Sequence, residues 1–290
     1  MKRFVLLLAL LLLCPALSLA AAGEPVGRVQ TYEGTVAAVS DGQKRGLALN
    51  DPLYANDTVV TGGDGFLQIM FADGTVLTMD AHTEMLLRDV SYTPGNSEGR
   101  NFNIDMIAGT CRFVTGQITK HNPEKFKVGS PLGTIGIRGT EGGVLAQAAN
   151  LAAFNAALSA ALAEPGPGWN PSVSPEITRQ TVAHFSGSVR KPMSFTDKFG
   201  KTVDIGRGQA LDVTAEGGAG SPRGVSDQDR RSFSEADFVT SAQVPSPYNS
   251  VFSGYDATPG GTAGGVVGGS GNGGDGAAGD AGGGDGHGGW

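Results

Sequence analysis

The sequence predicts an all-β fold of many short strands, with one alanine-rich helical insertion and a disordered glycine-rich C-terminal tail. Three observations lead to this prediction. Apolar and polar residues alternate over short runs from about residue 24 to 145, as they do along half-buried strands. Asp-Gly and other glycine-containing turns separate these runs. From about residue 216 onward the chain is rich in Gly and Ser and poor in core-forming residues.

The N-terminus has the features of a secretory signal peptide. Lys2 and Arg3 precede an uninterrupted apolar run at 4–13, which is too short for a comfortable membrane span. Small residues then favour cleavage after Ala20, with cleavage after Ala22 nearly as plausible. We therefore expect a periplasmic or secreted protein that has no transmembrane span once the signal peptide is removed.

The composition excludes several classes of function. Without Lys2 and Arg3, 19 of the 21 basic residues remain against 28 acidic ones, so the mature net charge is −9. An acidic chain without a basic cluster would be repelled by a phosphate backbone, which argues against nucleic acid as a partner. Only Cys111 remains after cleavage, so an intramolecular disulfide is impossible and a cysteine-based zinc site lacks ligands.

The strands from about 24 to 145 are predicted by period-two patterns. In the run Phe66 to Phe71, alternate apolar residues share one face, and Phe126 and Val128 follow the same pattern. Such strands fit either a solenoid-like stack or a compact sandwich. The recurrence of Asp64-Gly65 as Asp73-Gly74 favours the solenoid-like stack.

The alanine-rich stretch from about 146 to 164 interrupts the strand pattern. Leu151, Phe154, Leu158 and Leu162 share one helical face, and a Pro/Gly-rich segment ends the helix. We assign 146–178 to a helical and Pro/Gly insertion within a β domain that spans 24–215. A helix packed on the β domain is the favoured interpretation, and a partner-docking helix is the alternative.

The tail at 216–290 is predicted to be of low complexity. Its last part, from Pro259 to Trp290, is mostly Gly with Ala, Asp and Ser, and it cannot bury enough apolar surface to offset its chain entropy. Low complexity accounts for its composition better than a calcium-binding repeat does.

No catalytic, cofactor-binding or metal-ligating constellation is evident. His82 and Glu84 would share one face of a strand, but a solvated strand end explains them better than a metal or acid–base site. The Gly-x-Ser-x-Gly signature of a nucleophile is absent. Cys111 is interpreted as a small core residue. We therefore expect neither an enzyme nor a cofactor.

The stretch from Phe126 to Thr140, FKVGSPLGTIGIRGT, resembles the signature of the FecR-domain family, in which two apolar strands separated by a proline lead to Arg-Gly-Thr. The likeness covers roughly 30–213, with the helix as an insertion. Gly142-Gly143 depart from the pattern, which predicts a short or bulged strand after Arg138. Other segments that resemble family elements occur in order at 34–36, 49–53, 57–62, 65–75, 187–189 and 206–211.

The resemblance draws attention to two motifs, Asp73-Gly74-Thr75 and Arg138-Gly139-Thr140. We interpret both as structural. Arg138 is expected to donate hydrogen bonds to carbonyls at the end of a coil, while Gly139 gives the backbone room and Thr140 caps it.

The resemblance also implies a type of function. The name-giving proteins of the family are membrane-anchored regulators that relay the occupancy of a siderophore receptor to a sigma factor. This sequence resembles the stand-alone exported members instead. We therefore expect a non-enzymatic module that contacts an envelope or surface protein through its sheet edges or its inserted helix, for which a signalling or regulatory role is one form. The alternative is a structural or adhesive surface or matrix protein tethered by its glycine-rich tail.

Overall fold

The structure is a computed structural model, and it describes residues 23–93, 100–164, 166, 168–169, 175–187 and 192–233. The predicted signal peptide, the tail beyond residue 233 and the family-like residues 188–189 lie outside the described residues. None of the helices in the described part of the chain has the length and apolarity that a membrane crossing requires.

The described residues form eighteen strands and only a few short helices, so the predicted all-β class is confirmed. The strands are β1 (Gly27–Glu33), β2 (Val36–Ser40), β3 (Gln43–Gly46), β4 (Pro52–Leu53), β5 (Thr58–Thr61), β6 (Phe66–Phe71), β7 (Val76–Met79), β8 (Glu84–Tyr92), β9 (Arg100–Val114), β10 (Phe126–Ser130), β11 (Gly133–Gly136), β12 (Thr140–Ala148), β13 (Ile177–Gly187), β14 (Met193–Asp197), β15 (Thr202–Ile205), β16 (Gln209–Thr214), β17 (Gly218–Ala219) and β18 (Arg223–Gly224). The helices are α2 (Ile118–His121), α3 (Leu151–Ala163) and α4 (Asp227–Ser232), together with the 3₁₀ turn η1 (Pro123–Lys125).

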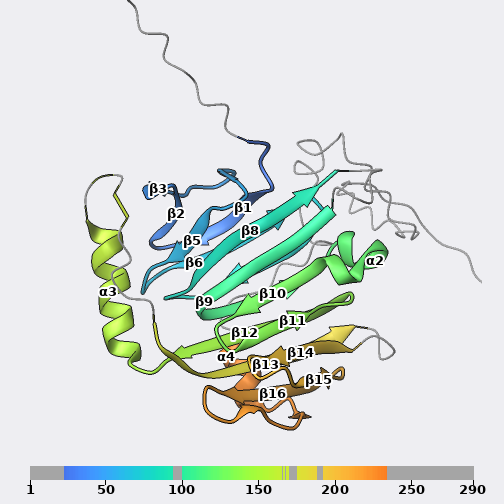
Figure 1. Cartoon of the computed structure of the whole chain (residues 1–290). Coiled ribbons are helices and arrows are strands. Elements are labelled where there is room, and N and C mark those ends of the chain that lie inside the picture. Colours follow the sequence, from blue (N-terminus) through green and yellow to red (C-terminus); the bar gives the residue numbers. More distant parts are fainter. Residues whose placement is uncertain are drawn as a thin grey trace, which may run out of the picture. The chain divides into compact units, whose positions relative to one another are not determined.

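The strands form two sheets that share the long strand β9 (Figure 1). Sheet A has the order β4-β1-β6-β7-β9-β12-β13-β16, followed by the short strands β17 and β18. Sheet B has the order β3-β2-β5-β8-β9-β10-β11-β14-β15. The first half of β9 pairs in sheet B and its second half in sheet A. The pairing is antiparallel except between β9 and β10.

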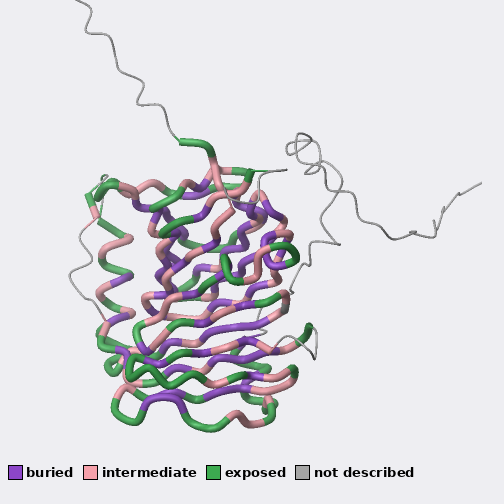
Figure 2. The backbone as a smooth tube through the Cα atoms, turned by 45° about the vertical axis from the view of Figure 1, so that its right-hand side comes forward, coloured by how far each residue is buried: buried purple, intermediate pink, exposed green. Residues whose placement is uncertain are grey.

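One apolar core lies between the two sheets. The ring of Phe71 in sheet A meets that of Phe102 in sheet B edge-on, with 4.7 Å between centroids. Phe102 stacks on Phe126 at 4.2 Å, and Phe126 in turn lies 6.2 Å from Phe113 in sheet A. Figure 2 shows buried residues recurring along the strands of both sheets. The fold is therefore a two-layer sandwich, whose chain passes repeatedly from one layer to the other, as in a solenoid.

The predicted helical insertion contains α3, which stands beside one end of the strands (Figure 1). Asn150 caps its N-terminus by accepting a hydrogen bond from the Ala153 N–H at 3.0 Å. Phe154 and Leu158, one turn apart, are buried against the core. At the other end, Lys44 Nζ donates to three carbonyls of the last turn and its cap, those of Ala161, Leu162 and Glu164. The helix is thus packed on the β domain, in agreement with the favoured interpretation.

The helix of the insertion begins later than the sequence predicts. Residues 146–148, which were predicted to be helical, belong to β12, where they pair with β13 and, through Ala146, with β9. Alanine favours a helix locally, but two flanking strands satisfy the backbone of this stretch and decide its conformation. A register shift between Glu141 and Gly142 confirms the predicted bulge, although β12 is not short.

The packed region continues beyond residue 215, where the sequence suggested that the tail begins. Residues 216–233 form β17, β18 and α4, and Phe233 is buried at 4% exposure. Phe233 packs with Ala183 and Ala210 on sheet A, with Val225 beside it. A few well-placed apolar residues are enough to hold a polar, glycine-rich segment against a sheet.

Candidate functional site

The motif Asp73-Gly74-Thr75 forms a buried turn between β6 and β7. The Asp73 carboxylate accepts hydrogen bonds from the Thr75 N–H and hydroxyl, both at 2.9 Å, and from the Ile118 N–H at 3.2 Å. The Thr75 hydroxyl in turn accepts from the Gly116 N–H at 2.9 Å. Burial raises the pKa of the Asp73 carboxyl, while these donors lower it. The motif therefore ties the β6–β7 turn to the segment that follows β9.

The motif Arg138-Gly139-Thr140 leads into β12 beside that same segment. Gly139 has a φ of +95°, and a Cβ there would lie 3.7 Å from Thr119 Oγ1 in α2. Arg138 is exposed, and it makes no hydrogen bond within the described part of the chain, in contrast to the carbonyl-binding role expected for it. Both motifs thus border residues 116–119, and Asp73 and Thr75 hold that segment by side-chain hydrogen bonds.

The candidates singled out from the sequence lie at a buried core position, Cys111, and around a turn, His82 and Glu84. Cys111 is fully buried, and burial raises the pKa of its thiol to about 12, which fits a core residue. His82 lies in a turn with a φ of +54°, and β8 starts only at Glu84, so the two do not share a strand face. No group of three or more His, Cys, Asp or Glu among the described residues is placed to hold a metal ion.

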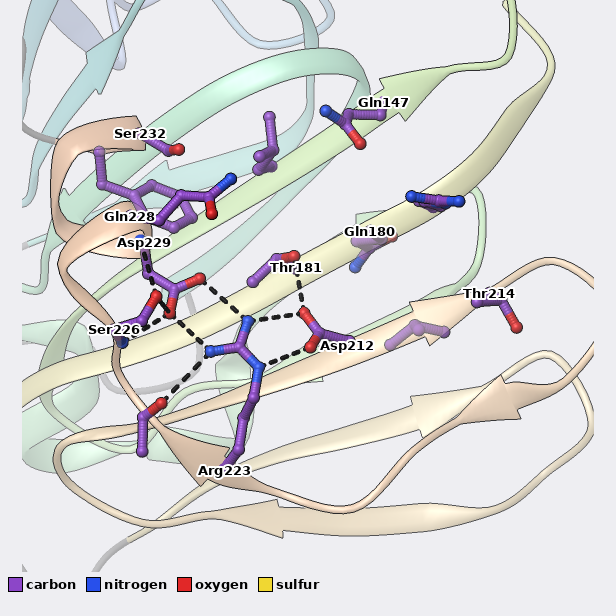
Figure 3. A pocket seen from close by; sticks show the side chains of 15 residues that line it. Gln147, Gln180, Thr181, Asp212, Thr214, Arg223, Ser226, Gln228, Asp229 and Ser232 are labelled. Carbon is purple, nitrogen blue, oxygen red and sulfur yellow. Dashed lines mark hydrogen bonds and ion pairs between the residues drawn. The ribbon is translucent and has the colours of Figure 1, made fainter.

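A groove lies on sheet A beside α4 (Figure 3). Its volume is about 660 Å³. Strands β12, β13 and β16 form its floor, and β18 and α4 form its wall. Its lining is mostly polar and consists of Leu145, Gln147, Arg179, Gln180, Thr181, Asp212, Val213, Thr214, Arg223, Gly224, Ser226, Gln228, Asp229, Ser232 and Phe233.

Arg223 lies between two carboxylates in this groove (Figure 3). Its Nε and Nη2 donate to Asp212 on β16 at 2.6 and 2.9 Å. Its Nη1 and Nη2 donate to Asp229 in α4 at 2.6 and 3.0 Å. Asp229 also exchanges hydrogen bonds with Ser226 in a capping box at the start of α4. A single guanidinium therefore joins the strand to the helix by two bidentate pairs.

These contacts determine the charge of the groove. The hydrogen bonds from Arg223 hold the pKa of Asp212 and of Asp229 below the usual range, and the two carboxylates raise the pKa of Arg223. Both acids are therefore ionised at neutral pH, and neither can serve as a general acid there. By contrast, Arg179 on the floor is exposed and makes no ion pair within the described residues.

Gly143 explains how α4 packs against sheet A. A Cβ at Gly143 would lie 2.6 Å from the Phe233 ring, so this glycine leaves the space that the ring occupies. Phe233 also meets Phe185 edge-on at 5.3 Å. On the opposite face of β12, a Cβ at Gly142 would lie 2.9 Å from the Phe113 ring. The Gly-Gly pair that departs from the family pattern thus allows aromatic packing on both faces of one strand.

Sequence reasoning did not identify this groove. Its signals were the Ser226-x-x-Asp229 capping box and the aromatic residue Phe233, inside a segment that had been assigned to the tail. The partner of Arg223 on β16 could not be found from spacing, because Asp212 is a strand residue with no local pattern to distinguish it.

Comparison with known proteins confirms the predicted resemblance. Residues 57–154 match the family described as FecR protein. Two crystal structures of a proposed anti-sigma factor from Parabacteroides distasonis ATCC 8503, at 2.50 and 1.65 Å resolution, align with TM-scores of 0.38 and 0.37 and 14% identity. Each alignment covers 59% of this chain and spans only 61% of the other.

A structure described as a cell surface anchoring domain aligns over 21% of this chain and 83% of its own, with 36% identity and a TM-score of 0.21. No curated protein matches the chain. The family match thus supports a FecR-like domain over residues 57–154.

Proposed function

We propose that this chain is an exported FecR-like module that makes protein–protein contacts in the cell envelope, in a signalling or regulatory role. The observation that carries the proposal is the groove on sheet A. It offers hydrogen-bonding side chains on a rigid sheet, while its two carboxylates are committed to Arg223. Such a surface is suited to holding a polypeptide segment and not to proton transfer.

The exposed residues of the groove indicate what it would hold. Gln147, Arg179 and Gln228 are exposed and present amide and guanidinium groups from three different elements. Amide side chains can pair with a peptide backbone, and a free guanidinium prefers a carboxylate or a carbonyl. We therefore expect an extended segment of a partner protein with an acidic side chain beside Arg179.

The test is site-specific photo-cross-linking in cells. A photoreactive residue at Gln228 should capture one dominant envelope protein, which mass spectrometry would identify. Arg179→Glu should abolish this capture, because it places a negative charge opposite the expected acid. Lys127→Glu is the matched control, since Lys127 is exposed on β10 in the other sheet. Equal loss of capture in both variants, or undiminished capture in Arg179→Glu, would refute the groove as the contact.

The inserted helix is tested in the same experiment. Leu151 at the start of α3 is 51% exposed, so a photoreactive residue there reports on contacts of the helix. A partner captured from Leu151 and not from Gln228 would place the contact on α3.

Deletion of residues 234–290 distinguishes the alternative function, a structural or adhesive role of the glycine-rich tail. If the protein is a contact module, the same partner is captured with or without these residues. If the tail is a tether, its deletion should release the protein from cells or matrix and leave no partner in the groove.

A further inference from the structure

Strand β15 leaves the edge of sheet B open. Within the described residues it pairs only with β14. The opposite edge of this sheet, β3, is bridged by Gly168, and the Trp169 N–H donates to the Gly42 carbonyl at 2.9 Å. In sheet A, the edge strand β4 begins with Pro52, which has no N–H to offer. The β15 edge lacks both kinds of protection.

The hairpin geometry shows which backbone groups of β15 are free. The Asp197 N–H donates to the Lys201 carbonyl at 2.9 Å and closes the β14–β15 hairpin. Antiparallel pairs alternate between hydrogen-bonded and non-hydrogen-bonded, so Val203 and Ile205 bond to β14. The backbone N–H and C=O groups of Thr202 and Asp204 therefore point away from β14, along the open edge.

The side chains of β15 are complementary to a second copy of the same strand. If two β15 strands pair antiparallel about Val203, Thr202 lies directly opposite the partner subunit's Asp204, and symmetry repeats this contact. A threonine hydroxyl can donate to a carboxylate at this separation. Val203, which is half-buried against the core, would meet the partner subunit's Val203 on the inner face.

The turns that flank β15 fit the same arrangement. Phe199, before the strand, is 62% exposed, the highest value among the exposed large apolar residues of the described chain. Arg207, after the strand, is exposed and makes no hydrogen bond within the described residues. Antiparallel pairing brings the turn of Phe199 beside the partner subunit's Arg207, where a guanidinium can cover an aromatic face.

We propose that two copies of this chain associate through their β15 edges and extend sheet B across a twofold axis. An isologous contact of this kind requires a surface that complements itself, and the Thr202–Asp204 and Phe199–Arg207 pairs meet that requirement. The contact uses neither the groove nor α4, so it does not depend on the function proposed above.

The test is sedimentation velocity of the mature full-length chain over a wide range of concentrations. The unsubstituted chain should show a monomer–dimer equilibrium. Thr202→Asp places two acidic residues opposite each other at two symmetric positions, and the dissociation constant should rise at least about tenfold. The double variant T202D/D204T restores one threonine opposite one aspartate and should restore the dimer.

Two further variants test whether the loss of the dimer is specific to the β15 edge. Asp204→Pro removes an N–H that points away from β14, so it should abolish the dimer while circular dichroism shows the fold intact. Thr134→Asp is the control, because Thr134 is exposed on the inner strand β11 of the same sheet. A chain that is monomeric at every concentration, a double variant that stays monomeric, or equal dissociation in Thr134→Asp would overturn the proposal.

Discussion

Asp73 shows how one residue can organise a family motif. Its carboxylate receives donors from its own turn and from Ile118, which lies far along the chain. The sequence made Asp73-Gly74-Thr75 recognisable through the family pattern, and its structural interpretation fits this network. The contact with Ile118 could not be predicted, because nothing in the local sequence specifies which distant segment returns to the turn.

Replacing Asp73 with Asn should therefore destabilise the whole domain. The amide offers one acceptor oxygen instead of two and places a donor against buried donors, so the free energy of unfolding should fall by about 2–4 kcal/mol. Urea unfolding measures this loss. Asp51→Asn is the matched control, because within the described residues the Asp51 carboxylate accepts only the Ala48 N–H, at 2.8 Å, in an exposed turn. A loss as large at Asp51 as at Asp73 would contradict the assigned role.

Glu84 should make the free energy of unfolding depend on pH. It is buried at 4% exposure and makes no ion pair within the described residues, and burial raises its pKa from 4.5 to about 7. The folded chain thus keeps a proton that the unfolded chain releases, and stability should fall as pH rises from 4.5 to 7, by up to about 3 kcal/mol.

Glu84→Gln should remove this contribution. The difference in unfolding free energy between pH 5 and pH 8, measured with urea, should change by about 3 kcal/mol relative to the unsubstituted chain, because glutamine stays neutral throughout. Glu124→Gln, at an exposed position in η1, serves as the control. An unchanged pH profile in Glu84→Gln would show that the carboxyl is not protonated in the folded chain.

At the scale of elements, α3 and β12 show the limits of local pattern. The helical face at Phe154 and Leu158 could be predicted because apolar residues recur one turn apart. The preceding alanines favour a helix by their own propensity, which is why the sequence predicted one there. Pairing with β9 and β13 decided their conformation, and those pairings depend on residues far away in the sequence.

The packing of α4 against sheet A depends on the absence of a side chain at Gly143. Gly143→Val should expel the Phe233 ring, with a loss of roughly 2–3 kcal/mol of packing, and should detach α4 from sheet A. Hydrogen exchange of residues 227–232 should then accelerate while the core strands stay protected. Gly46→Val is the control, because no atom lies within 4 Å of a Cβ at Gly46. Unchanged exchange in α4 would contradict the role of Gly143.

At the scale of the whole molecule, β9 determines the architecture. The alternation of apolar residues predicted strands, but it is the same in a sandwich and in a solenoid, so the arrangement of layers stayed open. What settles it is that β9 pairs with β8 and β10 in one sheet and with β7 and β12 in the other. Gly109 lies in this strand with a φ of +100°, at the start of its sheet A half.

Gly109 is a point where both sheets should be sensitive to one substitution. A Cβ there would lie 2.4 Å from Thr83 Oγ1, 2.5 Å from Thr83 Cα and 2.6 Å from the His82 carbonyl oxygen. Two of these atoms belong to the backbone and cannot move aside cheaply. Gly109→Ala should therefore lower the free energy of unfolding by more than about 3 kcal/mol, as strain in φ and a backbone clash combine.

Gly42→Ala separates the effect of the strained φ from that of the backbone clash. Gly42 also has a positive φ, of +72°, but no atom lies within 4 Å of a Cβ at this position. It should therefore show the cost of the backbone conformation alone, about 1 kcal/mol. Urea unfolding followed by both fluorescence and circular dichroism would compare the two variants. Equal losses would mean that φ alone matters and that β9 tolerates a side chain where the two sheets meet, whereas a much larger loss at Gly109 would show that the sandwich requires close backbone approach at that point.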